Sequence, residues 1–319
     1  MQSTLLKIKE SRWTARLLSP LMLLLLMLVF SVGTGGRFAN PRNLRMVVDQ
    51  ALVVATVATG AVFIFSSGNV NISMGASTAL AATIAAQAYL ATESVIVMAI
   101  VALGAGVIIL ALTALLSTWL RVPVLFVTVV MMTLLSSLQK GILGATTIQL
   151  PYAMTSGLNN AKVPYILFVV FFVLCTVLFH YTALGRKLRY IGINSRCAEM
   201  TGFSLWSNLF LAFIVAGVGV GFGALLTIIR SGSITTDTCA SLNMDCMLAI
   251  VLGGMSCFGG SRSNTWSAVI GAVMVTVMNN GMLMLGVSNM ILQGIRGIIF
   301  ILLVCLSQAR PKGLPSNDI

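Results

Sequence analysis

The chain alternates long apolar runs with short polar breaks along almost its whole length. A helix that crosses a membrane needs about 20 consecutive apolar residues. The pattern predicts an all-α integral membrane protein, a polytopic bundle of about ten transmembrane helices, with interrupted helices in both halves. The 247–258 segment is too short to cross alone. The expected segments are 17–32, 46–66, 72–91, 94–117, 122–138, 163–181, 206–229, 247–258, 264–285 and 289–307.

Composition agrees with this pattern. Of the 319 residues, 58% are hydrophobic and only 8% are charged, whereas a soluble domain carries about 25% charged residues. A soluble fold is therefore excluded. The net charge of +12 comes from basic residues in the expected tails and loops. They are not interleaved with aromatic residues on a polar face, so we expect no nucleic-acid partner.

The expected organisation is one membrane domain between two tails. Residues 1–16 form a basic N-terminal tail, 17–307 the transmembrane domain and 308–319 a C-terminal tail. The basic start followed by a short apolar run also resembles a signal peptide. We favour an uncleaved first span, because the chain returns to the membrane repeatedly after it.

Basic residues lie mostly on one side of the expected bundle. With a cytoplasmic N-terminus, twelve of the 19 Lys and Arg residues lie inside, as the positive-inside rule requires. Both tails and the 182–205 loop are then cytoplasmic. Three arginines between residues 37 and 45 argue mildly for the opposite orientation.

Two interrupted segments echo each other in the two halves. GAVFIFSSGNVNISMGA (60–76) and the stretch around 250–272 each carry a Gly, Ser and Asn break between apolar runs. Corresponding interruptions point to a transport site, because irregular backbone at membrane depth must be buried or line a watery cavity. Interhelical hydrogen bonds and close helix packing are the alternatives. The candidate pathway and gating residues are Asn69, Asn71, Gly253, Gly254, Gly259, Gly260, Asn279 and Asn280.

Ionisable residues give no sign of a proton relay. The seven acids fall in expected tails, loops or span ends, and the single histidine, His180, ends a span. Proton-driven carriers usually keep such a group in the membrane interior. Sodium coupling through backbone carbonyls stays open. Arg296 lies inside the last span, and we expect it to reach the outer interface rather than pair with another helix or with substrate.

Motifs for catalysis, metals and cofactors are missing from the sequence. The stretch from Gly254 to Ser261 has the glycine spacing of a phosphate loop, but Gly260 occupies the lysine position. No metal site or cofactor is expected, because the six cysteines form no C-x-x-C pair. Cys239 and Cys246 share an expected external loop, where free thiols are favoured over a disulfide.

The longest cytoplasmic loop, TALGRKLRYIGINSRCAEMTGFS (182–204), is basic and amphipathic. Leu184, Leu188 and Ile191 recur at helical spacing, as in short helices that dock in a partner's groove. A basic loop that merely satisfies the positive-inside rule is the alternative.

Three motifs resemble those of permease subunits of sugar-type bacterial ABC importers, the ribose, arabinose, xylose and galactose group. The loop matches T-x-x-G-R-x-L-x-x-I-G-x-N-x-x-A-A-x-x-x-G, with Glu199 at the second Ala. Residues 252–286 look like L-G-G-x-S-x-x-G-G-x-G-S followed by N-N-G and L-G, and Arg121-Val122-Pro123 with Val127-Thr128 is similar to K-V-P-x-F-I-V-T. The resemblance covers residues 44–307. One departure is Asn71, where the family has Asp.

The resemblance implies a non-catalytic subunit in a bacterial inner membrane. Its partners would be an ABC ATPase, a second permease copy or paralogue, and a soluble solute-binding protein, and its cargo a monosaccharide or similar small polar solute. An ion-coupled secondary transporter is the alternative function. The family's loop contacts the ATPase, which implies that the coupling residues are Gly185, Arg186, Lys187, Leu188, Gly192, Asn194, Ala198 and Gly202.

Overall fold

The computed structural model describes residues 12–144, 146–160, 162–256, 259–260 and 263–307, which are almost entirely helical. The 1–16 and 308–319 tails lie largely or wholly outside these residues. The helices are α2 (Arg12–Gly33), α3 (Pro41–Ser66), α4 (Met74–Thr92), α5 (Val95–Leu120), α6 (Val124–Leu143), α7 (Tyr152–Asn160), α8 (Val163–Tyr181), α9 (Ala183–Ile193), α10 (Ser195–Met200), α11 (Leu205–Ser231), α12 (Leu242–Leu252), α13 (Thr265–Met284) and α14 (Asn289–Ser307). Strands β1 (Ile148–Gln149) and β2 (Ser233–Ile234) pair antiparallel.

Six helices in the described part of the chain are long and apolar enough to cross a membrane: α3, α5, α6, α8, α11 and α13. The prediction of an all-α membrane protein is therefore confirmed. The count of about ten spans stays a prediction, because the apolar parts of α2, α12 and α14 are shorter.

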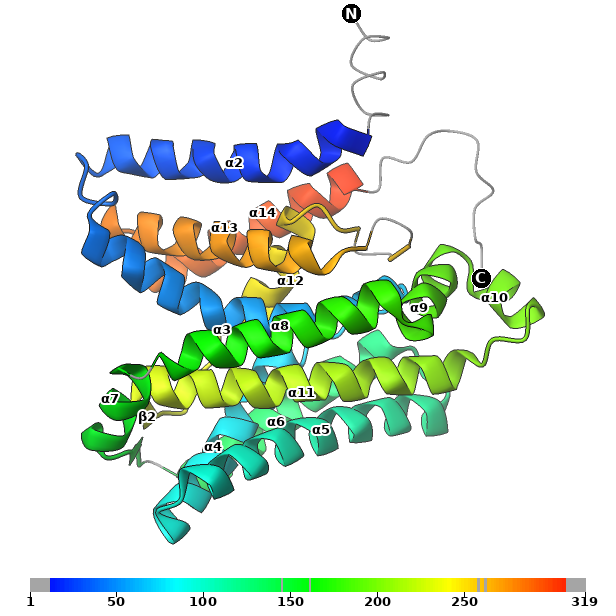
Figure 1. Cartoon of the computed structure of the whole chain (residues 1–319), viewed down its shortest axis with the longest axis horizontal. Coiled ribbons are helices and arrows are strands. Elements are labelled where there is room, and N and C mark those ends of the chain that lie inside the picture. Colours follow the sequence, from blue (N-terminus) through cyan, green and yellow to red (C-terminus); the bar gives the residue numbers. More distant parts are fainter. Residues whose placement is uncertain (1–11, 145, 161, 257–258, 261–262, 308–319) are drawn as a thin grey trace, which may run out of the picture.

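Helix α3 forms the centre of the bundle. From Ala51 to Ser66 every residue is buried, so this part of the helix has no face for lipid. It packs against α11, α13, α12 and α8, and Figure 1 shows it crossing between α13 and the layer of α8 and α11. A helix that is apolar on all sides is expected at such a position.

Small residues let α5 and α11 cross closely. A Cβ atom on Gly217 would lie 2.7 Å from the Cα of Val107, and one on Gly221 would lie 2.6 Å from the Cα of Leu103. Close backbone approach at small residues is a main source of helix association in membranes, where lipid removes the hydrophobic drive. Helix α11 is thereby fixed between α5 and α3.

The two expected interruptions are real breaks in the helices. Helix α3 ends at Ser66 and α4 begins at Met74, while α12 ends at Leu252 and α13 begins at Thr265. The side chain of Asn243 in α12 accepts hydrogen bonds from the backbone N–H of Gly75 (2.5 Å) and of Ala76 (3.4 Å). It satisfies free donors at the start of α4 and joins the two half-chains.

The bundle has two dissimilar ends. Helices α9 and α10 lie at one end in Figure 1, and α7 with β2 at the other. Cys175, Cys197, Cys239 and Cys246 are free thiols, so the expectation of free thiols at Cys239 and Cys246 is confirmed, although Cys246 is buried in α12 and not in an external loop.

The predicted orientation is testable through Cys197, which is exposed on α10. A chain that retains only this cysteine should react with a membrane-impermeant maleimide from the cytoplasmic face. A cysteine-free chain carrying Asn159→Cys, exposed on α7, is the matched control and should react from the opposite face. Labelling of both from one face, or with the two faces exchanged, would contradict the orientation.

Candidate functional site

The two breaks meet the α9–α10 segment at one place, which we call the junction (Ser66–Gly68, Gly192 and Gly259–Gly260). The backbone N–H of Gly260 donates to the carbonyl of Ser66 at 3.3 Å. A Cβ on Gly192 would collide with that same carbonyl oxygen and lie 2.8 Å from the nitrogen of Gly260. The junction is thus built from backbone contacts that only glycine permits, and it links both half-chains to α9.

Gly259 shows why the second break is rich in glycine. Its φ is +71°, a conformation that L side chains rarely adopt. A Cβ there would also lie 2.6 Å from the nitrogen of Gly68 and from the oxygen of Ser66. Gly259 and Gly260 of the second break therefore contact the first break at Ser66 and Gly68.

Most residues of the predicted coupling motif have local structural roles. Gly185 lies against the carbonyl of Phe179, where a Cβ would clash, and Leu188 is fully buried. The side chain of Asn194 accepts from the backbone N–H of Cys197 (3.1 Å) and caps α10. Ala198 is buried, and Gly202 follows α10 with a φ of +84°.

The opposite face of α9 and α10 is exposed. Tyr190 and Met200 expose 59% and 83% of their surface, and the nearby Arg186 and Arg196 are also exposed. The Lys187 ammonium lies 5.6 Å from the centre of the Phe203 ring. The exposed face therefore combines apolar and basic side chains, as a protein docking surface does.

A cavity of about 1240 Å³ lies beside the junction. Its walls are the first break, the turn between α5 and α6, the segment from Ile191 to Ser195 and the start of α11. The α9–α10 segment is thus packed against the bundle on one side and borders open space on another.

Sequence reasoning missed Arg189 as a site residue. Its Nη2 donates to the carbonyl oxygen of Phe179 at 3.0 Å, and its guanidinium carbon lies 4.5 Å from the centre of that ring. Burial lowers the pKa of Arg189 from its ordinary value. The only signal in the sequence was its place in the basic loop.

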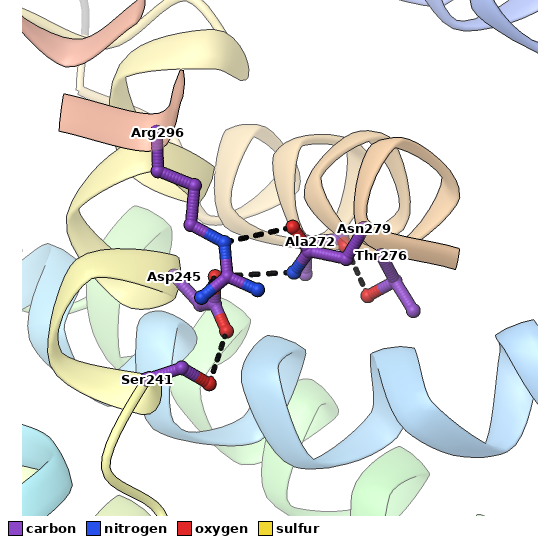
Figure 2. Close-up of polar contacts among 6 residues, drawn as sticks. All are labelled: Ser241, Asp245, Ala272, Thr276, Asn279 and Arg296. Atoms are coloured by element: carbon purple, nitrogen blue, oxygen red, sulfur yellow. Dashed lines mark hydrogen bonds and ion pairs between the residues drawn. The ribbon is translucent and has the colours of Figure 1, made fainter. Parts of the chain in front are cut away.

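A second polar cluster, the α12–α14 network, joins three helices (Figure 2). The Arg296 guanidinium lies 3.4 Å from the Asp245 carboxylate, and its Nε donates to the side-chain oxygen of Asn279 at 2.9 Å. Asn279 donates to Asp245 at 3.2 Å, and Ser241 donates to the other carboxylate oxygen at 3.1 Å. Each charge is thereby matched by a partner on another helix.

The network corrects two predictions. Arg296 is 7% exposed and pairs with another helix, so the expectation that it reaches the outer interface was wrong. Asp245 does lie near a helix end, in the first turn of α12, but it is 5% exposed, so the expectation that no acid lies in the interior was wrong. A buried charge is costly unless an opposite charge lies beside it, and Asp245 and Arg296 provide that opposite charge for each other.

The remaining candidates lie in different surroundings. Asn69 lines the cavity. Asn71 is buried and accepts from the N–H and the hydroxyl of Ser73 at 2.8 Å each, a local turn before α4 in which a carboxylate oxygen could accept as well. The side-chain oxygen of Asn280 is buried without a hydrogen-bond partner among the described residues.

Gly253 and Gly254 end α12. Gly253 lies against the carbonyl of Ser267 in α13, where a Cβ would clash, and Gly254 has a φ of +91°. Close helix packing therefore accounts for Gly253. Of the eight candidates, Gly259 and Gly260 lie at the junction, Asn69 lines the cavity beside it and Asn279 belongs to the network. No hydrogen bond among the described residues links Asn69 or Asn71 to Asn279 or Asn280, so the candidates do not form one site.

The helical bundle, with six long apolar helices in the part of the chain that the structure describes and two broken segments, is that of a polytopic membrane protein. A family model described as "Branched-chain amino acid transport system / permease component" matches residues 43–304, and the chain belongs to this family. The resemblance to permeases of sugar-type ABC importers is confirmed by its relatives. The protein is a multi-pass protein of the bacterial inner membrane and a membrane component for transport.

Three relatives match over most of their length. The galactofuranose transporter permease protein YtfT of Escherichia coli (strain K12) is 25% identical, covering 97% of this chain and 96% of its own. The ribose import permease protein RbsC of the same strain is 23% identical, covering 91% and 93%. The autoinducer 2 import system permease protein LsrD of Salmonella paratyphi B is 28% identical, covering 87% and 88%. No solved structure matches the chain.

Proposed function

We propose that the chain is the pathway-forming subunit of an ABC importer for a monosaccharide or a similar small polar solute. A separate ABC ATPase supplies the energy, a solute-binding protein delivers the cargo from outside, and a second permease copy or paralogue completes the pathway. The names of the relatives support this cargo class, since galactofuranose and ribose are small polyhydroxylated molecules.

The observation that carries the proposal is the junction. The α9–α10 segment presents apolar and basic side chains outward, while Gly192 on its inner side touches Ser66 and Gly260. A partner that moves the segment therefore acts directly on both interrupted segments. The network argues against the alternative of a proton-coupled carrier, because the buried acid Asp245 is already paired with Arg296. An ion-coupled carrier remains an outcome of the transport experiment below.

Reversing the exposed charge at Arg186 tests where the ATPase docks. In proteoliposomes that contain the permease with its ATPase and binding protein, Arg186→Glu should lower ATP-driven uptake by about tenfold, the effect of about 1.4 kcal/mol of lost coupling. Membrane insertion should be unchanged, because the side chain is exposed.

The control is Arg42→Glu, an exposed arginine in the first turn of α3 that lies outside the segment and does not line the cavity, and its uptake should stay near that of the unmodified chain. Equal uptake and equal ATPase stimulation in both variants would contradict the assignment of α9 and α10 as the docking segment.

A further inference from the structure

We propose that Arg189 is a positioning residue that fastens α9 to α8 and, through Phe179, to α3, so that displacement of the docking segment reaches the first break. The inference rests on the proposed function, since it assumes that an ATPase moves α9 and α10. It assigns a role to a position that the matched motif leaves open, and it defines a path into the membrane domain.

The first step of the path is the contact between α9 and the end of α8. Phe179 lies in the last turn of α8, where carbonyl groups have no partner within the helix. Arg189 donates to its carbonyl at 3.0 Å, and the cation lies over its ring at 4.5 Å. A cation at a helix C-terminus also interacts favourably with the helix dipole. One side chain thus makes two kinds of contact with one residue.

The second step runs from α8 to α3. The rings of Phe179 and Phe63 meet edge to face, with centroids 5.2 Å apart and planes at 78°. Both side chains are completely buried. Because protein interiors are close-packed, they transmit a displacement rather than absorb it. Phe63 lies in the last turn of α3, directly before the break.

The third step is the direction of movement. On its inner side α9 is fixed by Arg189 and, one helical turn later, by the contact of Gly192 with Ser66. The segment from Ile191 to Ser195 also borders the cavity of about 1240 Å³. The segment therefore has space to move into. When the segment moves, Arg189 displaces Phe179, and Phe179 in turn displaces Phe63 at the end of α3.

Arginine rather than lysine suits this position. The planar guanidinium can lie against a ring face and donate in its own plane at the same time, whereas an ammonium is a point charge with strong hydration. Arg189→Lys should therefore retain only part of the effect.

The first test is independent of the ATPase. In lipid nanodiscs, hydrogen exchange of backbone amides in residues 63–73 should be about tenfold faster in Arg189→Met than in the unmodified chain. Amides of α12 should be unchanged. The control Arg42→Met removes an exposed arginine in the first turn of α3 that does not line the cavity, and it should change neither region. Unaltered exchange in 63–73 would overturn the proposed path.

The second test uses the complete importer. Arg189→Met should still assemble with the ATPase and hydrolyse ATP, but the stimulation of ATP hydrolysis by the cargo-loaded binding protein should fall about tenfold. The stimulation in Arg189→Lys should lie between those of Arg189→Met and the unmodified chain. Full stimulation in Arg189→Met would overturn the proposal. An unmodified chain that assembles with no ATPase would instead overturn the proposed function, whatever the exchange data show.

A second variant covers the case that Arg189→Met fails to insert. Phe63→Leu keeps the contact of Arg189 with Phe179 but removes the ring-to-ring contact with α3. It should lower stimulation while leaving ATPase assembly intact, and unchanged stimulation would contradict transmission through Phe63.

Discussion

Arg296→Met should destabilise the membrane domain strongly, and a second substitution, Asp245→Asn, should restore much of the loss. Removing one member of a buried ion pair costs about 3–5 kcal/mol, because the other charge is left without a partner, whereas replacing both members is often nearly neutral. Loss of this size should lower Tm on the order of 10 °C. Thermal unfolding in detergent, followed by intrinsic fluorescence, measures the single and double variants as a cycle.

The effect is expected to be large because of how α14 is held. Its Met290, Ile291, Ile298, Ile301 and Leu302 side chains are exposed, as on a lipid-facing helix. Apolar contact alone gives little preference for protein over lipid, so interhelical polar contacts contribute a large part of association. The pair of Arg296 with Asp245, and its bond to Asn279, ties this helix to α12 and α13.

Figure 2 also supplies the control for this cycle. Thr276 is buried on α13 near Asn279, but its hydroxyl bonds only to the carbonyl of Ala272 in its own helix (2.7 Å). Thr276→Val should change stability by about 1 kcal/mol or less. Strictly additive effects of the Asp245 and Arg296 substitutions would contradict the account, because independent residues show no coupling.

Gly192→Leu should abolish coupled transport. A Cβ at this position collides with the carbonyl of Ser66, which is backbone and has no rotamer to change. The α9 helix must therefore move away from the junction. We expect ATP-driven uptake in proteoliposomes to fall by about a hundredfold, equivalent to about 2.7 kcal/mol of coupling. Uptake by Gly192→Ala should lie between those of Gly192→Leu and the unmodified chain.

The control is Gly141→Leu in α6. This glycine is also helical, but a Cβ there meets nothing within 4 Å, so insertion, stability and uptake should be close to those of the unmodified chain. Uptake by Gly192→Leu equal to that of the control would show that the contact between α9 and the breaks is not needed for transport.

Local features of the fold could be predicted from the sequence. The bounds of α8 and α14 coincide with the expected spans 163–181 and 289–307, since polar residues flank largely apolar runs there. The breaks after Ser66 and Leu252 were predicted because glycine, serine and asparagine disfavour the interior of a helix. The motif glycines of the loop were found through resemblance, and close contacts explain Gly185 and Gly192.

Contacts between distant segments could not be predicted in this way. The expected 247–258 span is displaced from the observed Leu242–Leu252 helix. Asp245 appeared to end the apolar run, but its charge is matched by Arg296 from the last helix. Likewise, Arg189 gained a role only when the fold placed the end of α8 beside it. Neither pairing leaves a local pattern in the sequence.

The central claim, that a separate ATPase drives transport through this chain, is tested most directly in proteoliposomes. The purified permease is reconstituted with its ATPase and with cargo-loaded binding protein outside, and labelled solute is counted inside. Uptake should require enclosed Mg-ATP, stop when the ATPase is omitted, and be unaffected by ionophores that dissipate sodium and proton gradients. Uptake that continues without the ATPase and collapses with an ion gradient would contradict the account.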